Sequence, residues 1–114
     1  MIIKNGLIMD PDSGFCGISD LRIQNGLITE TGENLPETQG EQTIDVSGLT
    51  VAPGLVDTHV HFRDPGFTYK ETIHTGALAA AKGGFTSVIC MANTSPVIDS
   101  VPVLTENLAK AEKE

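Results

Sequence analysis

The sequence predicts an α/β protein whose chain has two differently patterned parts. Residues 1–52 contain short apolar runs separated by Asn-Gly pairs and by a stretch with Gly and Pro, which is typical of strands and hairpins. Residues 53–114 twice alternate a short strand pattern with a helical pattern. Strand, helix and parallel strand form a βαβ unit, so we expect the second part to be the first two βα units of an incomplete TIM-type (β/α)8 barrel.

The N-terminal part contains a short internal sequence repeat. The sequence IKNGLI over residues 3–8 recurs as IQNGLI over residues 23–28. Asn-Gly between apolar residues is the strongest short hairpin signal, because both central positions of a type I′ turn need positive φ. We therefore expect two hairpin-like units, followed by a loop over residues 31–42 and renewed apolar spacing over residues 44–51.

The second part contains recognisable signals for the start and the end of a helix. Thr68 and Glu71 match a capping box, in which the Thr hydroxyl and the Glu carboxylate satisfy free amides at a helix start. We expect this helix to continue to Lys82, where Gly83-Gly84 supplies a left-handed stop.

A second strand is expected from Phe85 to just before Asn93, with Asp99 or Ser100 capping the helix that follows. Two barrel strands alone would leave open edges and uncovered apolar faces. The 114 residues are also too few for a barrel of about 250. The chain is therefore expected to be a piece of a longer protein.

The most informative segment covers residues 53–66 and reads PGLVDTHVHFRDPG. Side chains alternate faces along a strand, so we expect four polar side chains to share one face: Asp57, His59, His61 and Arg63. The Pro-Gly turn that follows places them at the C-terminal end of the strand, the usual position of an α/β active site. Two imidazoles at this spacing can bind one zinc ion; the plainer alternative is a solvated histidine pair.

The remaining histidine and the two cysteines are interpreted as structural. His74 lies in the middle of the predicted helix, away from the strand ends, and is expected to be a surface or half-buried helix residue. Cys16 and Cys90 are far apart in sequence, and an expected reducing compartment argues against a disulfide. Cys90 lies in an apolar run and is predicted to be a small core residue.

Charge and hydropathy exclude several classes of partner. Fifteen acidic and seven basic residues give a net charge of −8, which argues against a nucleic acid or an anionic membrane as partner. No stretch approaches the roughly 18 apolar residues of a membrane span. The N-terminus also lacks the pattern of a secretion signal. We therefore expect a cytoplasmic protein.

Two motifs of this chain resemble those of the dihydroorotase family, within the amidohydrolase superfamily. They are residues 53–66 and the segment CMANTSP over residues 90–96. The likeness covers essentially the whole chain, which corresponds to the N-terminal part of such an enzyme. It implies a metal-dependent hydrolase barrel preceded by part of a small β-sandwich over residues 1–52.

The two levels of the resemblance rest on different residues. The superfamily is recognised by the pattern Asp57-x-His59-x-His61. The narrower assignment rests on FRDPG over residues 62–66 together with Asn93. One departure is the alanine before Asn93, where many relatives have proline; it alters the turn more than the chemistry.

The resemblance implies a zinc-dependent cyclic amidohydrolase with one or two zinc ions. Such an enzyme reversibly interconverts dihydroorotate and N-carbamoyl-aspartate in de novo pyrimidine (UMP) biosynthesis. His59 and His61 would bind metal, and Asp57 would orient a histidine, with a buried acid bound to backbone amides as the alternative. The other ligands and the proton-shuttling Asp would lie beyond Glu114, so no catalytic residue is expected within this chain.

The substrate is expected to contact Arg63, Asn93 and His61. A guanidinium pairs bidentately with a carboxylate, and the Asn93 amide at the next strand end offers both a donor and an acceptor. The alternatives are a salt bridge of Arg63 with Asp64 or Asp57, and a plain turn role for Asn93. Asp64 itself is predicted to be solvated.

Two other functional readings stay open. Allantoinase and dihydropyrimidinase share the His-x-His pattern, although residues 62–66 with Asn93 favour a substrate that carries a carboxylate. A non-catalytic dihydroorotase-like subunit would instead serve as a scaffold, for example for aspartate transcarbamoylase. The presence of both histidines argues against a scaffold, which needs no metal ligands. Expected partners are thus a small-molecule substrate, further copies of the chain, or aspartate transcarbamoylase.

Overall fold

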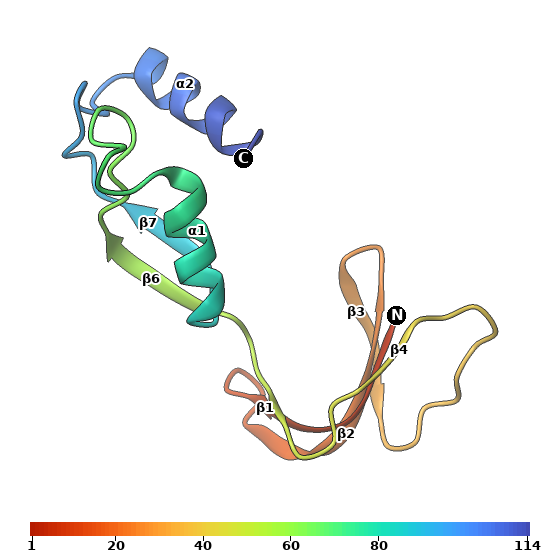
Figure 1. The fold of residues 1–114 in the computed structure, drawn as a ribbon. Coiled ribbons are helices and arrows are strands. Elements are labelled where there is room, and N and C mark those ends of the chain that lie inside the picture. Colours follow the sequence, from red (N-terminus) through yellow and green to blue (C-terminus); the bar gives the residue numbers. More distant parts are fainter. The chain divides into compact units, whose positions relative to one another are not determined.

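The computed structural model describes residues 1–114, and the chain divides into two compact units (Figure 1). The first unit is Met1–Pro53 and the second is Gly54–Glu114. The first contains only strands and loops, whereas the second combines two strands with two helices. Neither helix has the length and apolarity that crossing a membrane requires. The α/β class predicted from the sequence is therefore observed.

The first unit is a single five-stranded sheet. Its path order is β3-β2-β1-β4, and β5 also pairs with β1. Neighbours β1, β2 and β3 run antiparallel, whereas β4 and β5 run parallel to β1. The strands are β1 Ile2–Asp10, β2 Phe15–Gln24, β3 Leu27–Gly32, β4 Thr43–Asp45 and β5 Thr50–Val51.

The two Asn-Gly pairs of the sequence repeat adopt different structures. Asn25 and Gly26, at φ 53° and 77°, form the predicted hairpin turn, and Gln24 pairs with Leu27 across it. Asn5 and Gly6 lie inside β1 instead, where the register with β2 shifts, so the hairpin predicted there is wrong. Pairing on both sides of β1 keeps the strand continuous, and the Asn-Gly pair is accommodated as a bulge.

A buried acid fixes this bulge. Asp20 is 2% exposed, and its Oδ1 accepts the N–H of Asn5 at 2.8 Å while its Oδ2 accepts the N–H of Leu35 at 2.9 Å. The ammonium of Lys4 lies 3.8 Å from the same carboxylate. A buried carboxylate needs such partners because it has lost its hydration. Asp20 thus ties the bulge and the 33–42 loop to β2.

One surface of the first sheet is apolar and concave. It carries a hollow of about 760 Å³ whose lining includes Ile8, Phe15, Ile18 and Ile28. Ile18 and Ile28 are 59% and 61% exposed. The elements of this unit therefore leave an apolar face open.

The second unit contains a βαβ unit followed by a further helix. Its parallel strands are β6 Leu55–Val60 and β7 Phe85–Cys90, joined through α1 Ile73–Lys82, which packs on β7. The last element is α2 Val101–Ala111. This order is the predicted one. Whether the two βα units belong to a closed barrel stays a prediction.

Helix α1 begins four residues later than the capping signal predicted. Thr72 is the N-cap: its Oγ1 accepts the N–H of Thr75 at 3.1 Å, and its own N–H donates to Thr75 Oγ1 at 3.0 Å. Thr68 instead lies in a turn in which Lys70 N–H donates to Phe67 O. The predicted capping box of Thr68 and Glu71 is therefore wrong. Thr72 and Thr75 form the two reciprocal capping hydrogen bonds in its place, with a Thr hydroxyl in the role expected for the Glu carboxylate.

The other helix boundaries follow the sequence. Gly83 caps the end of α1 and Gly84 has φ 82°, the predicted left-handed stop. Ser100 is the N-cap of α2, although its side chain makes no capping hydrogen bond.

Cys90 differs from the prediction, because it is exposed rather than part of a core. Apolar neighbours on the same pair of strands, such as Val56 and Ile89, are also exposed at 58% and 55%. The second unit has one helix packed on this sheet, which cannot cover both of its faces.

Candidate metal and substrate site

The two histidines of the His-x-His pattern lie side by side at the C-terminal end of β6. His59 is the second-to-last residue of β6, and His61 follows directly after the strand. Their ring centroids are 5.1 Å apart and the rings are inclined by 67°. Because a ring nitrogen binds zinc at about 2.0–2.1 Å, two rings this close can share one ion.

Asn93 reaches the same place from the end of β7. Val60 pairs with Cys90, and Met91 N–H donates to Val60 O at 2.8 Å, so the two parallel strands end at the same level. Asn93 Oδ1 lies 2.9 Å from His61 Nδ1. An amide oxygen can only accept, so in this contact Nδ1 of His61 is the donor, and Nε2 is the ring nitrogen left to face a ligand.

This contact gives Asn93 a role that the sequence reasoning missed. Histidines that bind metals generally donate their other ring N–H to an acceptor, which fixes the tautomer and the ring orientation. The arrangement of His61 and Asn93 has this form. The signal was present in the sequence, since both residues follow neighbouring strand ends, but their pairing needed the register of β6 and β7.

Asp57 acts on His59 through the main chain. Its Oδ1 accepts the backbone N–H of His59 at 3.0 Å. The β6–β7 register is irregular between Asp57 and Val60, so β6 departs from a regular strand where the histidines begin. Asp57 is half-buried and holds this irregular segment, rather than contacting an imidazole ring.

The Arg63 side chain is half-buried and makes no ion pair in this chain. The salt bridges weighed for it, with Asp64 or Asp57, are not formed. Asp64 is 4% exposed and pairs with Lys110 of α2 instead, so the prediction that Asp64 is solvated is wrong. The guanidinium of Arg63 is thereby left available to a ligand.

The loop that carries Arg63 is attached to the loop that carries Asn93. Ser95 N–H donates to Pro65 O at 3.1 Å, and Phe67 N–H donates to Arg63 O at 2.8 Å. Gly66 has φ 91°, and a Cβ there would lie 2.0 Å from Ser95 O, so only glycine fits. Residues from the two strand ends therefore form one local structure.

The donor set fits a zinc ion in part. Two imidazoles at a strand end, one of which has its Nδ1 facing an acceptor, are suitable nitrogen ligands. The chain contains no group of three or more His, Cys, Asp and Glu side chains that could hold a metal. His74, the third histidine, is exposed on α1 as predicted, where its backbone N–H donates to Glu114 Oε2. His59 and His61 therefore form half of a typical site.

Comparison with known proteins gives the family. Residues 48–110 match the dihydro-orotase-like family. The dihydroorotase of Streptococcus pneumoniae serotype 4 is 56% identical over the whole chain, and that of Lactococcus lactis subsp. lactis is 51% identical. In both cases the chain spans 27% of the relative's length.

Solved structures give the same fold. The L-hydantoinase (dihydropyrimidinase) from Arthrobacter aurescens has a TM-score of 0.85 at 27% identity. The match covers 96% of this chain and 24% of the hydantoinase chain. The sequence comparisons and the structural comparison thus agree with the family indicated by the motifs at the ends of β6 and β7. The chain belongs to the dihydro-orotase-like family.

Proposed function

We propose that this chain supplies part of the active site of a zinc-dependent cyclic amidohydrolase. The reaction is the reversible interconversion of dihydroorotate and N-carbamoyl-aspartate, in de novo pyrimidine biosynthesis. The observation that carries the proposal is the adjacent pair His59 and His61, with His61 bound to Asn93, at the ends of two parallel strands. The relatives named dihydroorotase support the choice of reaction.

His59 and His61 would hold the zinc ion through their free ring nitrogens. A bound zinc ion supplies a water molecule of lowered pKa and polarises the amide carbonyl that is attacked. Asn93 keeps the proton of His61 on Nδ1, which leaves Nε2 for the metal. The remaining ligands and the proton-shuttling Asp are expected outside residues 1–114.

Arg63 would bind the carboxylate of dihydroorotate. Its guanidinium can donate two parallel hydrogen bonds to the two carboxylate oxygens, which both orients and selects the substrate. It has no competing ion pair in this chain, and its loop contacts the loop of Asn93 at Ser95. These contacts support a substrate site on the same strand ends as the histidines.

A hydantoinase or dihydropyrimidinase activity is the second candidate, because one of the similar solved structures is an L-hydantoinase. Hydantoin and dihydrouracil share the cyclic amide of dihydroorotate but lack its carboxylate, and allantoin is a third ring to compare. Measured values of kcat/KM for the four compounds on the complete protein distinguish these activities. Preference for dihydroorotate supports our proposal, and preference for another ring contradicts the substrate assignment.

The ligand assignment is tested in the complete protein with His59→Ala and His61→Ala. Each variant is expected to lose stoichiometric zinc, measured by metal analysis, and to lose turnover. His74→Ala is the matched control, since His74 is an exposed histidine on α1, and it should keep both. Retention of zinc and turnover in the His59 and His61 variants would show that they are not ligands.

The same metal analysis examines the scaffold alternative. A non-catalytic subunit is expected to hold no stoichiometric zinc and to turn over no cyclic amide. Self-association and association with aspartate transcarbamoylase stay proposals, and the mass of the complete protein in solution, alone and mixed with that enzyme, measures both.

A further inference from the structure

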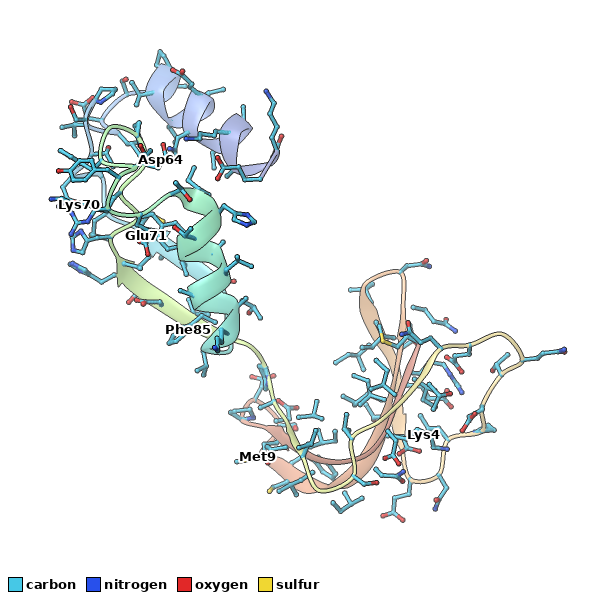
Figure 2. The ribbon with its side chains drawn as sticks, viewed as in Figure 1. Lys4, Met9, Asp64, Lys70, Glu71 and Phe85 are labelled. Atoms are coloured by element: carbon cyan, nitrogen blue, oxygen red, sulfur yellow. The ribbon has the colours of Figure 1, made fainter.

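Asp64 is buried beside a helix that lies far from it in sequence. It follows Arg63 directly, yet its side chain is 2% exposed and forms an ion pair with Lys110 of α2. Asp64 is labelled in Figure 2. Asn107, one turn earlier on the same helix, donates from Nδ2 to the carbonyl oxygen of Asp64 at 3.1 Å. Both the side chain and the main chain of Asp64 are therefore held by α2.

The same loop has a second anchor on its other side. Pro65 O accepts the N–H of Ser95, and Gly66 packs against the carbonyl of Ser95. Arg63 O is engaged by Phe67 N–H. The backbone around Arg63 is thus fixed from two directions, while the Arg63 guanidinium itself makes no ion pair in the chain.

Lys110 matters because a buried carboxylate cannot stay without a partner. Removing one member of a buried ion pair leaves an uncompensated charge, which the structure relieves by moving that charge to water. Lys110 is more open, with 42% of its side chain exposed, and its contact with Asp64 raises its pKa. Loss of the ammonium would therefore displace Asp64 and, with it, the adjacent Arg63.

We propose that Lys110 and Asp64 are positioning residues that set Arg63 for the substrate carboxylate, with Asn107 as their main-chain support. Helix α2 thereby takes part in substrate selection without touching the substrate. This inference rests on the proposed function, because it assumes that Arg63 binds the carboxylate. Lys110 acts only through the loop of Arg63.

The test uses Lys110→Met in the complete protein, with KM for dihydroorotate and zinc content as readouts. We expect KM to rise about tenfold with zinc content unchanged, because a small misplacement of a binding group is costly. Lys110→Arg should restore most of the affinity, since it returns a cation to Asp64. Lys113→Met is the control on the same helix, because Lys113 is exposed and forms no ion pair, and its KM should not change.

A double variant separates positioning from general stability. In an Arg63→Met background, which should itself raise KM, Lys110→Met is expected to add less than about twofold, because both changes remove one interaction. Effects that multiply, or a Lys110→Met protein with unchanged KM, would overturn the inference. If Arg63→Met leaves KM unchanged, the carboxylate contact of the proposed function fails instead. Should Lys110→Met not fold, Asn107→Ala replaces it, with the same rise in KM expected and an unchanged KM counting against the inference.

Discussion

The hydrogen bond between Asn93 and His61 has a measurable consequence for metal binding. Replacing the acceptor by Asn93→Ala frees the proton of His61 to move to Nε2, the nitrogen needed by the metal. We expect zinc affinity to fall by about 10–100-fold, as for other outer partners of metal-binding histidines. Competition with a chelator on the complete protein measures this change.

Asn93→Asp is the matched variant, since it keeps an oxygen acceptor at the same place. It should retain most of the zinc affinity. Equal losses in the alanine and aspartate variants would show that Asn93 does not act by accepting the His61 proton.

At the level of the elements, the N-cap of α1 is Thr72 and not the predicted Thr68. Thr72 closes a reciprocal pair of hydrogen bonds with Thr75, whereas Thr68 lies in the preceding turn. Thr72→Ala should lower the free energy of unfolding by about 1 kcal/mol, the usual cost of losing an N-cap. Thr68→Ala is the control and should change it by less than about 0.5 kcal/mol. Denaturant unfolding of both variants measures these changes. A larger loss of unfolding free energy in Thr68→Ala than in Thr72→Ala would contradict the observed cap.

In the strands, the pairing with neighbouring strands decides whether an Asn-Gly pair forms a turn. Asn25-Gly26 forms a turn because β2 and β3 pair on either side of it. Asn5-Gly6 has the same local preference, but β4 and β5 lie along β1 and the strand passes through. Gly6 then serves close packing, since a Cβ there would lie 2.9 Å from Val46 and Val51.

The stability of the whole molecule should depend on pH through carboxylates such as Asp45. Hydrogen bonds from Ser47 and then from Asn5 hold the pKa of Asp45 below its ordinary value of 3.8. A lowered pKa means that this stabilisation is fully present above the ordinary value and is lost as pH falls through the lowered one. Asp45→Asn should therefore destabilise the protein at neutral pH, and the difference from the parent should shrink below pH 3.8.

Denaturant unfolding of parent and Asp45→Asn across this range provides the measurement. Asp12→Asn is a suitable control, because the Asp12 carboxylate accepts no hydrogen bond and joins no ion pair. A gap between parent and Asp45→Asn that persists unchanged in acid would mean that Asp45 stabilises the fold by something other than its charge.

At the scale of the whole molecule, the chain spans 27% of the length of the dihydroorotases that it matches. Its own residues give two histidines, an arginine and an asparagine at the ends of β6 and β7. The closed barrel stays a prediction. The relatives named dihydroorotase confirm the resemblance that the motifs indicated.

The sequence by itself determined what depends on short stretches of chain. The α/β class, the order of strands and helices, the Asn25-Gly26 turn, the Gly84 stop and the family were all readable from it, because local periodicity and motif chemistry suffice. Tertiary structure alone decided which side chains meet. The bulge at Asn5, the bond between Asn93 and His61, and the burial of Asp64 against Lys110 join residues 15 to 46 positions apart. Such contacts depend on strand register and helix packing, which local preferences do not encode.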